Sequence, residues 1–373
     1  MTKTNSELCD YSGMASDGKM LWYINSENFL MSINLLNGIS TFLGVIPNTS
    51  NISYSYRTLL YINNALFLIP YYARTLVKYD LNEKKFVSIP FPEELLNVFG
   101  QGYLNLFGGF VSQDEMIMYG MNHFIIKYDF KQCSFSWIDV SKIQNKLKID
   151  VNFWNDGFYI ADKNYYPIVG HRVILEEDHI SGKIQLIKWG NVVEKNQTIT
   201  KKYKDKICFV SISDDWNMKI DVIDPIFPEK YETIFDVQLE SEAVHHCDEP
   251  PFLCGDVVGD KLVLYPGYQN YLWIIDLRTV CVEKNSISNN KYRKAICFNS
   301  IKTSKNKTAS ILQNDEKIVV YDEAEDEITF REIFIDDYST ELLKKEYFDI
   351  LKNTGIIKEQ ATIVDVNTFL EWI

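Results

Sequence analysis

The sequence predicts an all-β fold, a seven-bladed β-propeller of four-stranded antiparallel blades. One motif recurs seven times: two apolar strands, a short loop between them, and an Asp or Asn at the end of the second strand. The motifs end at Asn34, Asp80, Asp129, Asp178, Asp224, Asp276 and Asp322, so the successive spacings are 46, 49, 49, 46, 52 and 46 residues. Four short strands in a repeat of this length are typical of propeller blades, because closing the ring removes exposed sheet edges.

The strands can be assigned copy by copy. In chain order, the seven strand pairs are contained in "MLWYINSENFLMSIN", "ALFLIPYYARTLVKYD", "MIMYGMNHFIIKYD", "FYIADKNYYPIVGHRVILEED", "ICFVSISDDWNMKIDVID", "LVLYPGYQNYLWIID" and "ASILQNDEKIVVYD". A further strand precedes each pair, as in "YSYRTLLYI", and a fourth follows the Asp turn. A short helix is expected in "EELLNVF", residues 93–99, between the second and third copies. The seven Asp or Asn residues have two interpretations, a ring of carboxylates or turn stabilisation. We favour the turns, because these side chains bond their own backbone two residues on.

The repeat ends before the C-terminus. We expect the propeller to span residues 1–335, and residues 336–373 to form a helix and a tail packed on it. Helical spacing is shown by Leu343, Tyr347, Ile350 and Leu351. This spacing predicts an amphipathic helix over residues 339–353, with Asp337 or Ser339 as its N-cap.

The charge balance of the 373-residue chain limits its partners. With 38 basic and 51 acidic residues, the formal net charge is -13, which disfavours nucleic acid and anionic membranes. The N-terminus lacks the apolar run of a secretory signal. Seven cysteines stand singly along the sequence, as expected for reduced thiols. We therefore expect a cytoplasmic protein.

Three of the repeats resemble kelch repeats at the end of their third strand. The segments "KYDLNEKKF", "KYDFKQCSF" and "VYDEAEDEI" combine a Tyr-Asp pair with an apolar residue six positions after the Asp. The kelch-like pattern extends over roughly residues 9–333, but the kelch diglycine is missing, and the one Gly-Gly pair (Gly108 and Gly109) stands in a first strand instead. The resemblance implies the propeller fold and transfers no functional residue.

The loops between the second and third strands of each blade are the candidate ligand-binding face. We expect them at residues 26–28, 71–74, 121–123, 163–172, 213–217, 267–270 and 314–316. They contain tyrosines and a tryptophan but no phenylalanine, together with arginine, histidine and amide side chains. The predicted ligand-binding residues are Tyr71, Tyr72, Arg74, Asn122, His123, Tyr165, Tyr166, His171, Arg172, Trp216, Tyr268 and Asn270. Aromatic rings with polar tips suit stacking on a peptide or sugar; the alternative is that they pack between blades.

Catalytic and metal-binding patterns are weak. The loop "LESEAVHHCDEPPFLC" contains His245, His246 and Cys247, but its ligand spacing does not match a structural zinc site. We find no nucleophile elbow, P-loop or dinucleotide motif, and so expect no cofactor and no metal. The sequence favours a non-catalytic binding or scaffolding propeller for a protein, peptide or glycan ligand. The alternative is a lyase or hydrolase resembling streptogramin lyases, with a histidine and a carboxylate at the central opening.

Overall fold

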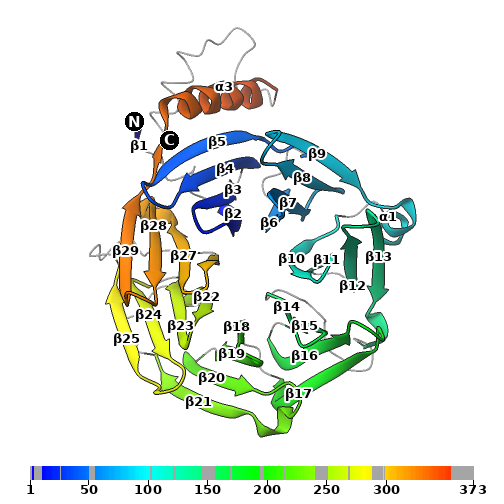
Figure 1. Ribbon diagram of the computed structural model, residues 1–373, viewed down its shortest axis with the longest axis vertical. Helices are drawn as coiled ribbons and strands as arrows, with labels where there is room; N and C mark the ends of the chain where they lie inside the picture. Colours follow the sequence, from blue (N-terminus) through cyan, green and yellow to red (C-terminus); the bar gives the residue numbers. More distant parts are fainter. Residues whose placement is uncertain are drawn as a thin grey trace.

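The computed structural model describes residues 2–3, 11–25, 27–49, 55–100, 103–120, 123–143, 156–168, 170–193, 197–213, 215–239, 251–267, 269–287, 297 and 299–353. Seven antiparallel blades of four strands stand around a central opening (Figure 1), and two further short strands extend the sheet of blade 1 to six strands. This arrangement confirms the predicted fold class. Within each blade the strands follow the sequence order, with the first strand innermost and the fourth outermost (Figure 1).

The blades have the following strands. Blade 1 contains β2 (Tyr11–Ser16), β3 (Met20–Asn25), β4 (Phe29–Asn34) and β5 (Ile39–Val45). Blade 2 contains β6 (Tyr56–Ile62), β7 (Ala65–Pro70), β8 (Thr75–Asp80) and β9 (Lys85–Pro90). Blade 3 contains β10 (Leu106–Ser112), β11 (Glu115–Gly120), β12 (Phe124–Asp129) and β13 (Ser134–Asp139). Blade 4 contains β14 (Phe158–Ile160), β15 (Lys163–Pro167), β16 (His171–Asp178) and β17 (Ile184–Val193).

The last three blades repeat the same order. Blade 5 contains β18 (Gln197–Tyr203), β19 (Lys206–Ile212), β20 (Asn217–Ile223) and β21 (Glu232–Gln238). Blade 6 contains β22 (Phe252–Val258), β23 (Lys261–Pro266), β24 (Tyr271–Asp276) and β25 (Val282–Ser286). Blade 7 contains β26 (Ser300–Ser304), β27 (Lys307–Leu312), β28 (Lys317–Asp322) and β29 (Glu327–Glu332). The helix α1 (Glu93–Phe99) follows blade 2, as predicted, and the described residues include the 3-10 turns η2 (Pro228–Lys230) and η4 (Gln313–Asp315).

The Asp or Asn that ends each third strand stabilises the turn that follows. All seven side chains accept a hydrogen bond of 2.7–3.2 Å from a backbone N–H two or three residues further on. Asp276 accepts two such bonds, from Arg278 and Thr279, both at 2.9 Å. The Thr279 N–H in particular lowers the pKa of Asp276 to about 2. The turn interpretation of these residues is confirmed.

The core of the ring lies between the blades. Each of seven apolar clusters in the described part of the chain joins two neighbouring blades. For example, Trp22 and Leu30 of blade 1 pack with Leu66 and Leu68 of blade 2. The second strands, such as β7, β11 and β23, are buried along almost their whole length, which explains why they read as continuous apolar runs rather than as an alternating pattern.

One loop prediction was wrong. The segment 163–172 is not a loop, because β15 and the start of β16 lie within it, and only residues 168–170 connect them. The chain makes a tight turn at Ala161 and Asp162, which adopt positive φ angles of 46° and 63°. No glycine marks this turn in the sequence, and the prediction therefore missed it. "FYI" is therefore the first strand of blade 4 rather than the second.

A strand that follows blade 7 closes the ring by pairing with the outermost strand of blade 1. The strand β30 (Phe334–Ile335) pairs in parallel with β5 of blade 1, and β1 (Thr2–Lys3) pairs with β30. Gly38 makes this close approach feasible. Its φ is +74°, and a Cβ at this position would lie 2.2 Å from the carbonyl oxygen of Glu332. We call the contact between β5, β30 and the helix that follows it the closure clasp.

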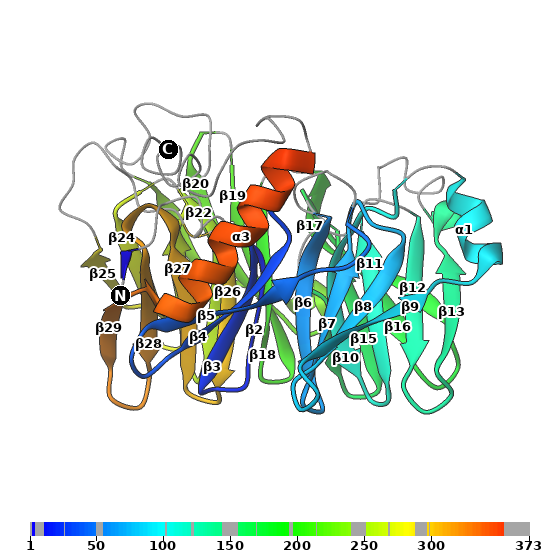
Figure 2. The ribbon, with the colours of Figure 1, turned by 90° about the horizontal axis from the view of Figure 1, so that it is seen from above.

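The C-terminal helix α3 (Asp337–Asn353) lies outside the ring, beside β5 (Figures 1 and 2). It begins two residues earlier than predicted, and its N-cap is Asp336 rather than Asp337 or Ser339: the Asp336 Oδ1 accepts the Ser339 N–H at 2.8 Å. Leu343 is buried in the cluster between blades 7 and 1. Among the residues that the structure describes, no helix is long and apolar enough to cross a membrane.

Candidate functional site

The loop between β7 and β8 is organised by one backbone carbonyl. The N–H groups of Tyr71, Tyr72 and Ala73 all point to the carbonyl oxygen of Ser55, at 2.8, 3.1 and 3.2 Å. The Asn105 N–H donates to the carbonyl oxygen of Tyr71 at 3.0 Å, which ties the loop to the connection from blade 2 to blade 3. Because these contacts hold the turn, the loop does not require the usual Gly, Asn or Asp.

The rings of this loop form a cluster with two neighbouring residues. The Tyr71 ring lies 4.0 Å from that of Tyr72 and 4.5 Å from that of Phe107, and the Tyr72 ring lies 5.0 Å from that of Tyr103 (centroid distances). The Arg57 guanidinium stands 4.6 Å above the Tyr71 ring, a cation–π arrangement. Tyr71, Tyr72, Tyr103, Phe107 and Arg57 are called the aromatic cluster below.

The aromatic cluster has a buried base and an exposed edge. Tyr71 is 8% exposed, whereas Tyr103 is 43% exposed and Tyr72 is half-buried. Burial raises the pKa of Tyr71 to about 12. The Tyr72 hydroxyl donates to the Tyr71 hydroxyl at 3.3 Å. Arg57 and Phe107 come from β6 and β10, the innermost strands of blades 2 and 3. The cluster therefore reaches from the loop to the inner wall of the ring.

Both arginines among the predicted ligand-binding residues have partners inside the protein. Arg74 donates from Nη1 to the carbonyl oxygen of Gly100, at 2.9 Å, where α1 ends. Arg172 is 7% exposed, and its Nη2 lies 3.3 Å from Asp221 Oδ2. Arg74 holds the loop against α1, and Arg172 belongs to a buried ion pair rather than to a loop surface.

Tyr165 and Tyr166 lie in the core. They belong to β15 and are 2% and 0% exposed. The Tyr166 hydroxyl donates to Glu177 Oε2 at 2.7 Å. Tyr165 packs in the cluster between blades 4 and 5, and Tyr166 in the cluster between blades 3 and 4. These two rings follow the packing alternative, because a fully buried side chain presents no surface to a ligand.

The remaining predicted residues are distributed around the ring. His123 is exposed, and His171 and Asn270 are half-buried. Trp216 packs at the edge of the cluster between blades 5 and 6, with a positive φ of 63°. The structure therefore does not bring them together with the aromatic cluster. Two others, Asn122 and Tyr268, lie outside the described residues, as do His245, His246 and Cys247.

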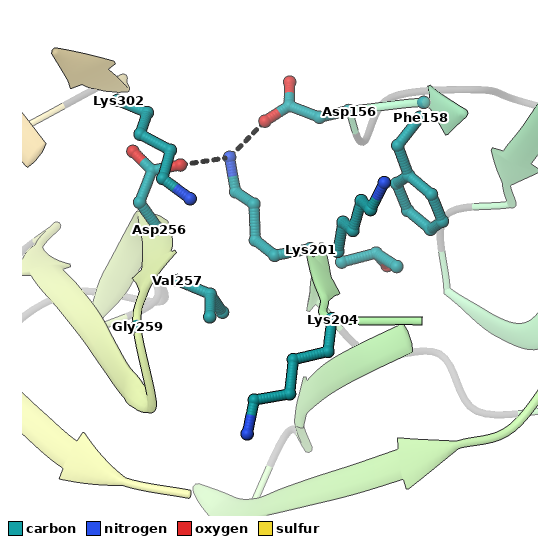
Figure 3. A pocket seen from close by; sticks show the side chains of 11 residues that line it. Asp156, Phe158, Lys201, Lys204, Asp256, Val257, Gly259 and Lys302 are labelled. Carbon is teal, nitrogen blue, oxygen red and sulfur yellow. Dashed lines mark hydrogen bonds and ion pairs between the residues drawn. The ribbon is translucent and has the colours of Figure 1, made fainter. Parts of the chain in front are cut away.

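A cavity of about 370 Å³ lies on the inner wall of blades 4 to 7 (Figure 3). It is lined by charged side chains from β18 and the turn after it, from β22 and β26, and from the segment before β14: Lys201, Lys202, Lys204, Lys302, Asp156 and Asp256. Lys201 lies between the two carboxylates, bonded to Asp156 and 3.2 Å from Asp256 Oδ1 (Figure 3). Burial disfavours the Lys201 charge, but the two carboxylates outweigh burial and raise its pKa. This space is called the lysine cavity below.

A histidine and a carboxylate approach each other elsewhere. His179 Nδ1 lies 3.9 Å from Glu115 Oε2. Glu115 is on β11, a second strand, and His179 is in a turn after β16, so this pair does not belong to the innermost strands. In the part of the chain that the structure describes, no three His, Cys, Asp or Glu side chains are grouped to hold a metal ion.

The sequence-based prediction missed Arg57, Tyr103, Phe107 and the lysine cavity. Arg57 occupies a strand position in "YSYRTLLYI", and the prediction considered only loops. An available signal was the series of lysines in "TKKYK", residues 200–204, on a strand that the propeller topology places innermost. Charged residues on an innermost strand have the central opening beside them.

The comparisons with known proteins show the fold alone. No protein-family model matches the chain, and no curated protein matches its sequence. A solved streptogramin B lyase is 12% identical, with a TM-score of 0.61 over 83% of this chain and 93% of that one. Sqt1 of Saccharomyces cerevisiae is 6% identical, with a TM-score of 0.57 over 88% and 87%. Hsv2 of Kluyveromyces lactis is 12% identical, with a TM-score of 0.52 over 87% and 99%.

Proposed function

We propose that this chain is a non-catalytic binding propeller that captures a segment of a protein partner at the aromatic cluster. The observation that carries the proposal is the graded burial of this cluster, with a buried base at Tyr71, a half-buried ring at Tyr72 and an exposed ring at Tyr103. Tyr and Arg are enriched at protein interfaces, because they offer a large contact area and polar groups at once. A base held by packing also limits the entropy lost on binding.

The finer assignments belong to the same proposal. A peptide is preferred to a glycan, because the cluster combines ring edges with a cationic group suited to backbone carbonyls and carboxylates. A cytoplasmic location is supported by the cysteines, which are free throughout the described residues. The repeats are kelch-like in their Tyr-Asp turns, and the proposed binding does not depend on this resemblance.

A peptide selection tests the proposed function. A random peptide library would be selected on the immobilised protein, and the enriched peptides measured by fluorescence anisotropy. The variant Tyr72→Ala/Tyr103→Ala removes the half-buried and the exposed ring and leaves the buried base in place. We expect it to keep the fold and to lose at least about tenfold in affinity. The matched control is Tyr338→Ala, because Tyr338 is 74% exposed on α3, away from the cluster.

Two outcomes of this experiment would contradict the proposal. Equal affinity of the double variant and the control would overturn the assignment of the aromatic cluster. Enrichment of no peptide, together with binding on a glycan array that the double variant loses, would replace the peptide by a carbohydrate ligand and contradict the proposal as stated.

A further inference from the structure

The lysine cavity is a second polar site, separate from the aromatic cluster. Four lysines and two aspartates line it, a formal charge of +2 for the lining, and Lys204 forms an ion pair with Asp260 outside the lining at 2.6 Å. The whole chain, in contrast, carries -13. A concave site with an excess of positive charge concentrates anions. The cavity is thus a local exception to the repulsion that the chain exerts on anions.

The two carboxylates do not neutralise all of the lysines. Asp156 binds Lys201, and Asp256 uses Oδ1 for Lys201 at 3.2 Å and Oδ2 for the Thr308 hydroxyl at 2.9 Å. Figure 3 shows Lys302 reaching from β26 toward the same part of the cavity. Within the described residues, the ammonium of Lys302 has no hydrogen bond and no ion pair. Lys302 is an exposed residue, and partial desolvation lowers the pKa of its ammonium; the like charges of Lys201 and Lys202 add to this effect, and the Asp256 carboxylate opposes it.

A buried hydroxyl also lacks a partner. Thr200, on β18, is 1% exposed and lines the cavity, and its Oγ1 forms no hydrogen bond in the described structure. A buried polar group without a partner is uncommon, because the loss of its hydration is not compensated. One ammonium and one hydroxyl without acceptors, in the same cavity, are the groups that a bound oxyanion would satisfy.

We propose that the lysine cavity binds a small organic anion carrying a phosphate or carboxylate group, with Lys302 and Thr200 as its direct contacts. Lys201 would not contact it as strongly, because the two carboxylates already hold that ammonium. The volume is larger than a single phosphate requires, and Phe158 and Val257 supply apolar surface for the rest of the ligand. This proposal does not rest on the peptide-binding function, because the two sites share no residue.

Isothermal titration calorimetry with pyrophosphate and with citrate tests the proposal on the full chain. The variant Lys302→Met removes the charge and keeps most of the side chain. Thr200→Val removes the buried hydroxyl and keeps the shape. The matched control is Lys183→Met, which makes the same change of net charge on an exposed turn of blade 4. Thermal melting of each variant shows that it is folded.

We expect saturable binding of at least one probe to the wild-type chain and to Lys183→Met. Lys302→Met should bind at least about tenfold more weakly, and Thr200→Val several-fold more weakly. The tighter probe shows whether phosphate or carboxylate chemistry is preferred. Absence of saturable binding up to about 10 mM of both probes, or equal affinity of Lys302→Met and Lys183→Met, would overturn the proposal.

Discussion

Removal of the Ser339 hydroxyl should release the closure clasp. Ser339 is fully buried at the start of α3, and its Oγ accepts the Phe42 N–H of β5 at 2.9 Å. The same hydroxyl donates to Asp336 Oδ2 at 2.8 Å. A single hydroxyl therefore connects blade 1, the N-cap of α3 and the strand that closes the ring. In Ser339→Ala the Phe42 N–H loses its acceptor, and Asp336 Oδ2 loses the hydrogen bond from the Ser339 hydroxyl.

The size of the effect follows from these contacts. A partly buried donor left without an acceptor costs about 1–3 kcal/mol, and loss of an N-cap side chain costs about 1 kcal/mol. We therefore expect Ser339→Ala to destabilise the docking of α3 by about 2 kcal/mol, and Asp336→Ala by about 1 kcal/mol. Because both residues act in one hydrogen-bonded chain, the double variant should lose less than the sum of the two changes.

Hydrogen exchange followed by mass spectrometry measures this local effect. A loss of about 2 kcal/mol corresponds to roughly 30-fold faster exchange of the amides that open with α3. The acceleration should be confined to α3 and β5. Lys345→Ala is the control, because Lys345 is an exposed position on the same helix. Unchanged exchange in Ser339→Ala, or equal acceleration in all seven blades, would refute this description of the clasp.

Three further predictions concern other parts of the ring. Gly38→Ala should lower the free energy of unfolding by about 3 kcal/mol in urea denaturation, because a Cβ there meets a backbone oxygen at 2.2 Å. Gly182→Ala, with a similar positive φ and open space around it, should cost only about 1 kcal/mol, and an equal cost at both sites would contradict the steric explanation. The pKa of Asp276 is lowered on folding, so its charge contributes stability above the unfolded pKa of about 4, and this contribution is lost as the pH falls toward 2. The difference in stability between the wild type and Asp276→Asn should therefore shrink over that pH range, and a difference independent of pH would be the contrary result. Burial raises the pKa of the Cys208 thiol to about 12, whereas Cys133 is exposed, so iodoacetamide at about pH 8 should label Cys133 in the native protein and Cys208 only after denaturation; labelling of both at equal rates would contradict the structure.

The blades could be predicted from the sequence because their signals are local. An apolar strand that ends in Asp specifies its own turn, and the side chain of Asp80, for example, bonds the N–H groups of Asn82 and Glu83. The seven repeats, spaced by 46 to 52 residues, reinforced the assignment. The helix α1 was found for the same reason, since its residues need little information from distant parts of the chain.

The site could be predicted only in part, because it depends on contacts between blades. The segment that contains Tyr165 and Tyr166 was assigned to a loop instead of a strand. The reason is a turn at Ala161 and Asp162, which has positive φ angles without the glycine that would mark it in the sequence. Arg172 meets its partner Asp221 across the boundary between blades 4 and 5. No sequence pattern places these two residues together.

The aromatic bias of the loops had two physical origins. Part of it is packing, as the burial of Tyr71 shows, so that replacing Tyr71 is expected to affect stability as well as binding. The other part is the exposed edge formed by Tyr72 and Tyr103, and Tyr103 lies in a connection between blades that the loop-based prediction did not include. Exposure, which separates the two origins, is a property of the assembled ring.

The most direct test of the proposed binding face is to locate a selected peptide on the protein. A benzophenone group would be placed in the peptide, and the cross-linked residues identified by mass spectrometry. We predict cross-links to residues 71–74 and 103–107 at the junction of blades 2 and 3, and their loss in Tyr72→Ala/Tyr103→Ala. Cross-links to the outer strands, or to the turns on the opposite side of the ring, would contradict the assignment of the aromatic cluster as the binding site.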